Sequence, residues 1–467
     1  MWQGFAFAAG KMVVLVTIVV LARILSPHEY GLVALATVLM AYVETIADAG
    51  MAQALVYLPR TGEVARSALL ISLMVGVSLA SGAFLAAPLI AALYNVPEVA
   101  PLMRVLAISL LATSSAAVPE ALLRRDLLFR RLTAAPMIRA AVTGAVSLSL
   151  AFAGVGAWSL AIGTSAGSAA YAVSCWLLLP GQRPWQMWRV RKDALRANLN
   201  FGAPVAGSTL LARLIFDVDY LIIGLLLGTQ ALGFYTLAFR LPEMVIINVF
   251  FVLSTVMFPL YTQVRGDREL LRSGYLKSVR LQALYGVTAG VGLAVVAPVL
   301  VPVLFGPQWK DAVVPLVFLA LYAAARSLGA GANDIYKALG RPGLSIGISL
   351  VRLVLLVPCL LFATQWGIIG VACAQMIVAV VFACGMQMAA AHVIQLRARQ
   401  LLRAVVPGLV CGAAAALAGL GTLALPLLGG VTTTILTVAA GVAVAYGVLR
   451  WGFPGLHDEL LQLARRR

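Results

Sequence analysis

Charged side chains stand inside stretches of this sequence that are otherwise apolar. Two long apolar runs near the middle of the chain carry Arg213, Asp217 and Asp219 in the first and Arg240 and Glu243 in the second. An ionisable group is costly in hydrocarbon, so such groups usually line protein interiors or water-filled cavities. This placement indicates a path by which charged cargo crosses a membrane.

Deep cations have the chemistry to hold a phosphorylated head. Arginine stays charged when buried and can donate two parallel N–H groups to phosphate oxygens, whereas lysine acts as a point charge. We predict that the substrate is bound by the deep cations Arg240, Arg326 and Arg352, with Lys11 as their partner. The alternative for cations near predicted span ends is to reach the lipid headgroups, which applies to Arg23, Arg104 and Arg139.

Local spacing offers two of these arginines a partner on their own helix. Arg213 and Asp217 stand at i,i+4, and Arg240 and Glu243 stand at i,i+3, where side chains are neighbours on a helix surface. For Arg213 we favour this pairing over a role in transport. For Arg240 we favour the substrate role.

Four carboxylates have the placement to couple transport to an ion gradient. Glu44 and Asp48 share one face of the second apolar run, and Asp217 and Asp219 lie near mid-depth in the seventh. Buried carboxylates can hold Na⁺ or take up and release a proton. We therefore expect a coupling Na⁺ or H⁺ and no other cofactor. The alternative for Asp48 is a solvated acid at a helix end.

The composition restricts the class of protein. The chain is 62% hydrophobic and 11% charged, which indicates a polytopic, all-α membrane protein. Its formal charge of +17 sits mainly in short loops between apolar runs, which argues against nucleic-acid binding. The five cysteines and three histidines are scattered without metal-ligand spacing, and no phosphate-binding GxxxxGK[ST] loop occurs.

Fourteen apolar runs are candidates for membrane spans. They cover residues 5–25, 31–58, 67–93, 101–123, 133–153, 156–179, 201–227, 231–259, 275–305, 312–336, 342–364, 367–392, 402–424 and 431–450. With both termini in the cytoplasm, the inside loops hold 25 of the 34 Lys and Arg residues and the outside loops hold only Lys310. Removing one span would destroy this asymmetry. The first run is too long for a secretory signal, so we expect it to be a spanning helix.

A weak internal repeat predicts how these spans are grouped. Residues 22–39 align with residues 223–240, so that Gly31 meets Gly233 and Leu35 meets Leu237. We expect residues 1–180 to form one lobe of six spans, residues 181–199 an amphipathic cytoplasmic linker, and residues 200–395 a second six-span lobe. Residues 396–467 would add two further spans and a basic tail.

Several stretches resemble a known family. They are ARILSPHEYGLVALATVLMAYVETIADAGMAQALV (22–56), NFGAPVAGSTLLARLIFDVDYLIIGLLLGTQALGFYTLAFRLPEMV (200–245), LFGPQWKDAVVPL (304–316) and RSLGAGANDIYKALGRP (326–342). Together they resemble the polysaccharide transporter branch of the MOP flippases, close to the Wzx flippases for lipid-linked oligosaccharides.

The resemblance implies two six-helix lobes around a central cavity that opens alternately to each side of the bacterial inner membrane. It implies an oligosaccharide repeat unit on a polyprenyl pyrophosphate as substrate, moved to the periplasmic leaflet. In related lipid II flippases, cations of the first, second and eighth spans contact the anionic head. Lys11, Arg23 and Arg240 match that pattern by position, whereas the second span carries Glu44 and Asp48 instead of a cation.

Two other functions compete with this interpretation. A multidrug cation antiporter of the same superfamily would need an acidic cavity and would have no use for deep arginines. A membrane polymerase or glycosyltransferase would need a long loop with clustered acids, and the predicted external loops are too short for one. We favour the flippase, which is not an enzyme, with a polysaccharide polymerase and a chain-length regulator as partners in the membrane.

Overall fold

The computed structural model describes residues 2–48, 50–51, 54–55, 62–180, 192–424 and 430–458, and their regular elements are all helices. Clustering of contacts divides the chain into two compact units, Met1–Gly233 and Phe234–Arg467, which we call unit 1 and unit 2. The all-α fold predicted from the hydropathy pattern is therefore confirmed.

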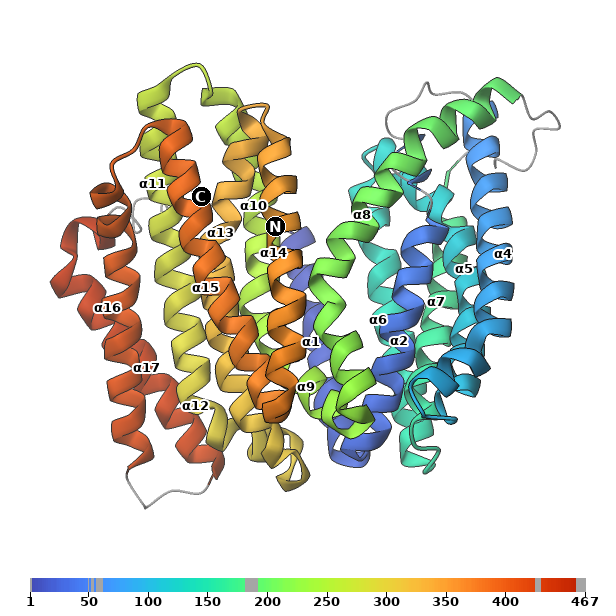
Figure 1. The fold of residues 1–467 in the computed structure, drawn as a ribbon, viewed down its shortest axis with the longest axis horizontal. Helices are drawn as coiled ribbons and strands as arrows, with labels where there is room; N and C mark the ends of the chain where they lie inside the picture. The colour runs from blue at the N-terminus through green and yellow to red at the C-terminus, as the bar shows by residue number, and fades with distance from the viewer. Residues whose placement is uncertain are drawn as a thin grey trace. The chain divides into compact units, whose positions relative to one another are not determined.

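In the part that the structure describes, unit 1 holds seven long helices and the start of an eighth. They are α1 (Trp2–Ile24), α2 (Pro27–Ala47), α4 (Gly62–Leu93), α5 (Val99–Arg125), α6 (Phe129–Phe152), α7 (Trp158–Leu178), α8 (Lys192–Leu226) and α9 (Gly228–Pro242), the last of which passes into unit 2. The neighbours α4, α5 and α7 can be followed side by side in Figure 1. The α6–α7 contact is close because Gly163 lies against Ser147 and Gly167 against Thr143.

Unit 2 continues through two π-helices and further long helices. These are the π-helix Glu243–Ile247, α10 (Asn248–Val264), α11 (Arg268–Gln282), the π-helix Ala283–Val287, α12 (Thr288–Phe305), α13 (Val313–Ala338), α14 (Pro342–Ala363), α15 (Gly367–Ile394), α16 (Ala398–Leu423) and α17 (Gly430–Gly452). Helix α13 is the most buried and packs against α10, α12 and α15. The two π-helices are joined where the Tyr285 hydroxyl donates to the Val245 carbonyl at 2.5 Å.

Eleven segments of the described part are long and apolar enough to cross a membrane. One of them, Gly343–Ile394, contains both α14 and α15, and neither α1 nor α8 is among the eleven. Helix α8 carries Arg213, Asp217 and Asp219 within two turns, which lowers its hydropathy. The chain is a multi-pass membrane protein, and the number of fourteen spans stays a prediction.

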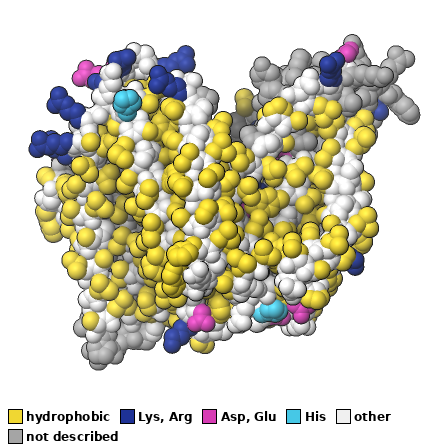
Figure 2. Space-filling model, viewed as in Figure 1, with side chains coloured by type: hydrophobic (Ala, Val, Ile, Leu, Met, Phe, Trp, Pro, Cys, Tyr) yellow, Lys and Arg dark blue, Asp and Glu magenta, His cyan; other side chains and the backbone are white. Residues whose placement is uncertain are grey.

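The surface of the helices fits a lipid environment. Figure 2 shows apolar side chains spread over the visible helices, with Lys and Arg gathered towards helix ends. Large apolar side chains are strongly exposed in both units, as with Leu89 at 74% in α4 and Val354 at 68% in α14. Water would make such exposure costly, whereas hydrocarbon makes it neutral.

Helix α8 packs within unit 1. It contacts α2 and α4, and the Asn198 side chain donates from Nδ2 to the Val64 carbonyl at 3.2 Å. The predicted linker at 181–199 lies mostly outside the described residues, which resume at Lys192. The boundary between the two units falls after the seventh predicted span. The lobe bounds expected from the sequence remain predictions.

The aligned glycines of the internal repeat touch one another inside unit 1. A Cβ on Gly31 would overlap the Thr229 carbonyl oxygen, and a Cβ on Gly233 would overlap the Pro27 carbonyl oxygen. In the alignment Pro27 corresponds to Thr229, so the two contacts are equivalent. Glycine is required at both positions because the backbones approach too closely for any side chain.

Candidate functional site

The charges of α8 form an ion pair along the helix. Arg213 Nε lies 2.9 Å from Asp217 Oδ2, and their side chains are 39% and 20% exposed. The pairing that we favoured for Arg213 from the i,i+4 spacing is therefore present. Asp219 is only 3% exposed, and its Oδ1 accepts the Tyr220 backbone N–H at 3.0 Å.

Helices α2 and α6 bring further charge to this pair. Glu44 of α2 interacts electrostatically with Arg139 of α6 and with Arg213 of α8. Tyr42, two residues before Glu44, interacts in the same way with Asp217 and with Arg213. Unit 1 thus contains a charged cluster from three helices, defined here as Glu44, Arg139, Arg213 and Asp217.

Arg139 is a member of this cluster that sequence reasoning missed. The alternative that we gave for it was the headgroup region, because it lies near a predicted span end. Its guanidinium instead lies over the Tyr171 ring, 5.7 Å from the ring centroid, and faces Glu44 electrostatically. No sequence signal could have found this role, because the partners are on other helices and far away along the chain.

Asp48 lies outside this cluster. It is the C-cap residue of α2, with its backbone N–H bonded to the Glu44 carbonyl. It interacts electrostatically with Glu120 and Arg124 of α5, which form an ion pair at 2.8 Å. This position matches the helix-end alternative for Asp48 and leaves its role in ion coupling a prediction.

Two of the predicted substrate-binding cations, Lys11 and Arg23, are on α1. Lys11 is half-buried in the middle of the helix, and Arg23 is exposed in its last turn. Twelve residues of helix separate them by about 18 Å along the axis. They are therefore too far apart to hold the same phosphate group.

Arg240 of α9 and Arg326 of α13 lie near a contact between these two helices in unit 2. Arg240 Nη1 donates to Glu243 Oε2 at 3.0 Å, at the point where α9 gives way to a π-helix. Arg326 of α13 donates to the Tyr322 hydroxyl at 2.6 Å, and the Tyr322 ring packs against Phe239 at 5.9 Å between centroids. The structure therefore brings the end of α9 next to the turn of α13 that carries Arg326.

Arg352 lies on α14 and is half-buried. Its Nε and Nη2 atoms are buried and have no hydrogen-bond partner among the described residues. A buried guanidinium that lacks an acceptor is costly, which favours a site where an anion supplies the missing acceptors. In the described part of the chain, no three His, Cys, Asp or Glu side chains gather as a metal ion would require.

Comparison with known sequences gives a consistent set of relatives. The family described as "Polysaccharide biosynthesis protein" matches residues 20–314. The lipopolysaccharide biosynthesis protein WzxC of Escherichia coli (strain K12) is 25% identical over 390 residues, covering 81% of this chain and 77% of WzxC. The succinoglycan biosynthesis transport protein ExoT of Rhizobium meliloti (strain 1021) is 29% identical over 310 residues, 66% of this chain and 62% of ExoT.

A third relative and two solved structures extend the comparison. The teichuronic acid biosynthesis protein TuaB of Bacillus subtilis (strain 168) is 26% identical over 65% of this chain, a match that spans 63% of TuaB. The lipid II flippase MurJ in an inward closed conformation superposes with a TM-score of 0.78 at 13% identity, covering 97% of this chain and 99% of MurJ. An inward-facing multidrug resistance MATE transporter of the MOP superfamily reaches 0.65 at 17% identity, over 83% of this chain and 96% of its own. The fold is that of this group of transporters.

Proposed function

The chain belongs to the polysaccharide biosynthesis protein family, and from that premise we propose that it is a flippase for lipid-linked oligosaccharides. It moves repeat units on polyprenyl pyrophosphate from the cytoplasmic to the periplasmic leaflet, for surface or exopolysaccharide synthesis. Two relatives are named for lipopolysaccharide and succinoglycan biosynthesis, and ExoT is named a transport protein, which supports transport rather than an enzymatic step. Alternating access is supported by the transporter fold.

The observation that carries this proposal is the pair of buried guanidinium nitrogen atoms of Arg352. Its Nε and Nη2 atoms lack acceptors among the described residues, and a pyrophosphate offers several oxygens in the geometry that arginine grips bidentately. Arg240 and Arg326 lie in the same unit and can add positive charge to this binding. Lys11 and Arg23 of α1 would bind the head at other stages of transport.

The membrane location and the partners follow from the same pattern. The concentration of Lys and Arg in alternate loops supports cytoplasmic N- and C-termini in the bacterial inner membrane. A polysaccharide polymerase and a chain-length regulator would act next on the exported repeat unit. Energy would come from Na⁺ or H⁺ bound by carboxylates of unit 1, foremost the buried Asp219, with Glu44, Asp48 and Asp217 as further candidates.

One observation favours a second function, a multidrug cation antiporter. The fold also matches a MATE transporter, and unit 1 gathers acids on α2 and α8. The flippase is favoured by the relatives in polysaccharide biosynthesis and by Arg352, whose Nε and Nη2 atoms have no acceptor among the described residues. The two functions differ in the sign of the charge that the cavity must hold.

A vesicle assay tests the proposal directly. The full chain is reconstituted in liposomes that contain a fluorescent polyprenyl-pyrophosphate-linked sugar, and flipping is measured as the fraction of label that becomes accessible to a membrane-impermeant quencher. Arg352→Gln should slow flipping by about 30-fold or more, because charge-assisted hydrogen bonds to the head are lost, and Arg352→Lys should recover part of the rate.

The matched control is Arg104→Gln, which removes the same charge from α5. Arg104 is exposed, with its guanidinium 5.2 Å from the centroid of the Phe84 ring, so this variant should flip at the normal rate. Normal flipping by Arg352→Gln would show that Arg352 does not hold the head. Transport of an organic cation in place of the labelled lipid would favour the antiporter.

A further inference from the structure

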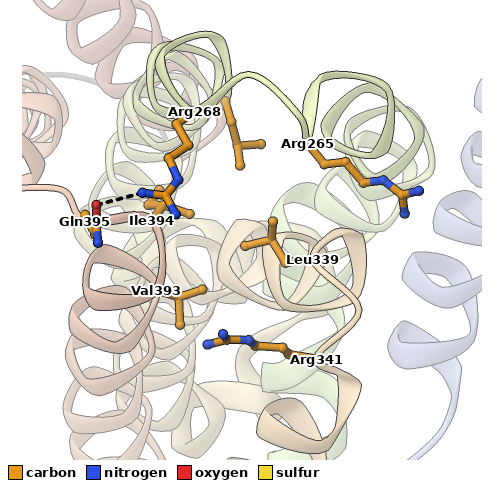
Figure 3. Close-up of a pocket in the computed structure, with 8 residues that line it drawn as sticks. Arg265, Arg268, Leu339, Arg341, Val393, Ile394 and Gln395 are labelled. Carbon is orange, nitrogen blue, oxygen red and sulfur yellow. Dashed lines mark hydrogen bonds between the residues drawn. The ribbon is translucent and has the colours of Figure 1, made fainter.

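A basic cavity lies at one end of unit 2, apart from the residues predicted to bind substrate. Its volume is about 240 Å³, and it is bounded by the start of α11, the turn that follows α13 and the end of α15 (Figure 3). The lining consists of Arg265, Arg268, Leu271, Leu339, Arg341, Val393, Ile394 and Gln395. A water molecule has about 30 Å³ in the liquid, so the cavity has room for a phosphate-sized group.

The charge of this cavity has one sign. Three of its eight lining residues are arginines and none is acidic. Two acids flank Arg268 in the sequence, and neither lines the cavity. Asp267 is the N-cap of α11, where its Oδ1 accepts the backbone N–H groups of Glu269 and Leu270 at 2.9 and 3.0 Å, and Glu269 is in the first turn. Among the described residues, no acid forms an ion pair with Arg268 or Arg341, so their charges add within the cavity.

Two arginines of α11 share one neutral acceptor at the cavity wall. Arg268 Nη1 and Arg272 Nη2 both donate to Gln395 Oε1, at 3.2 and 3.3 Å, and Arg272 Nε donates to the Ile394 carbonyl at 2.7 Å. Gln395 is held there by its left-handed backbone, with φ of 55°, at the C-terminus of α15. Figure 3 shows Arg268 descending to Gln395 while Arg341 extends below Leu339 towards Val393. Guanidinium groups from different helices thus approach one small space.

The surroundings point to a lipid headgroup rather than to a soluble anion. Half of the lining is aliphatic, from Leu271, Leu339, Val393 and Ile394. In the first turns of α14, directly after Arg341, Leu344 and Ile346 are exposed by 40% and 53%. Basic pockets between membrane helices next to apolar surface are suited to anionic headgroups whose acyl chains continue along the helices.

We propose that this cavity binds the phosphate group of an anionic phospholipid in the leaflet that this end of unit 2 faces. Arg268 and Arg341 hold the phosphate oxygens, Gln395 positions Arg268, and the acyl chains lie along the exposed apolar start of α14. The bound lipid neutralises the positive charge that is concentrated at these helix ends. It thereby stabilises the packing between the ends of α11, α13 and α15.

The test measures lipid retention by the full chain in detergent, by native mass spectrometry. The probes are phosphatidylglycerol and phosphatidylcholine of matched acyl chains, with inorganic phosphate as the soluble anion. We expect retention of phosphatidylglycerol over phosphatidylcholine, and about thirtyfold weaker retention in the double variant Arg268→Gln, Arg341→Gln, since each cation near a membrane surface contributes about 1 kcal/mol. The single variant Arg341→Lys keeps the charge and should bind with intermediate strength.

The matched control is the double variant Arg399→Gln, Arg403→Gln, which removes the same charge from exposed positions of α16 outside the cavity. It should retain phosphatidylglycerol like the unmodified chain. The proposal is overturned if both double variants lose equal affinity, if the cavity variant binds normally, or if inorganic phosphate displaces the lipid fully at millimolar concentration. Measuring the unfolding temperature of each variant without added lipid ensures that weaker retention does not merely report misfolding.

Discussion

The two compact units differ in how they balance charge. Unit 1 has sixteen Lys and Arg residues against ten acids, whereas unit 2 has eighteen against only seven. In unit 1 two cations inside the helices interact with acids, Arg213 with Asp217 and Arg139 with Glu44. In unit 2 Arg240 is paired with Glu243, whereas Arg326 donates to a phenol and Arg352 has two buried nitrogen atoms without an acceptor in the described part.

This difference suggests that the two units have different roles in transport. A charge cluster that is close to neutral can change its protonation or bind a small cation without large reorganisation, which suits energy coupling. Guanidinium groups that outnumber acids are stable in hydrocarbon only when a bound anion neutralises their charge. Such groups are suited to the transport of a phosphorylated substrate. We therefore predict that removing an arginine from unit 2 slows transport more than removing an arginine from unit 1.

The largest expected effect separates arginines in the two units. Arg352→Ala should lower surface polysaccharide by about 100-fold in cells, because it removes a cation that has no acidic partner in the described part of the chain, which corresponds to about 2.7 kcal/mol. Arg213→Ala should lower it by less than about threefold, since Arg213 is engaged by Asp217. The measurement is polysaccharide per unit of membrane-inserted protein. Equal losses in the two variants would remove the distinction between the units.

A smaller effect concerns the ion pair of α8. Asp217→Asn leaves Arg213 without its partner and should lower the free energy of unfolding by about 1–3 kcal/mol, less than for a fully buried pair because Arg213 is 39% exposed. The double variant Arg213→Gln, Asp217→Asn should recover most of this loss, as measured by chemical denaturation in micelles. Additive losses in the double-mutant cycle would show that the pair contributes nothing.

The smallest expected effect tests whether a carboxylate of unit 1 couples transport to an ion gradient. Asp219→Asn should slow flipping driven by an imposed Na⁺ or pH gradient by about tenfold, because a neutral amide can neither hold Na⁺ tightly nor exchange a proton. Flipping without a gradient should change little. The measurement is the vesicle assay with and without each gradient, and a preserved gradient response would exclude Asp219 as the coupling group.

Local patterns predicted much of this protein correctly. The i,i+4 spacing predicted the Arg213–Asp217 pair, since one turn of helix places those side chains together regardless of the rest of the fold. The repeat alignment paired Gly31 with Gly233, and these two glycines lie at one close backbone contact. The resemblance of the quoted stretches to polysaccharide transporters agrees with the family match.

Contacts between distant segments were not predictable in the same way. The headgroup alternative for Arg139 rested on a span end that is visible in the sequence, whereas its partner Glu44, on another helix, is not. The basic cavity joins Arg268, Arg341 and Gln395 from three separate helix ends. No spacing rule relates such positions, because the chain between them can follow many paths.

The sequence alone determined that the chain is helical and lies in a membrane, because hydropathy and helical periodicity are local properties that add along the chain. It also determined which charges are available within the apolar runs. Only the tertiary structure decided which of those charges interact with an acid on another helix and which have no acceptor among the described residues, as with Arg139 and Arg352. That outcome depends on how whole helices pack, and packing sets the distances on which electrostatic interactions depend.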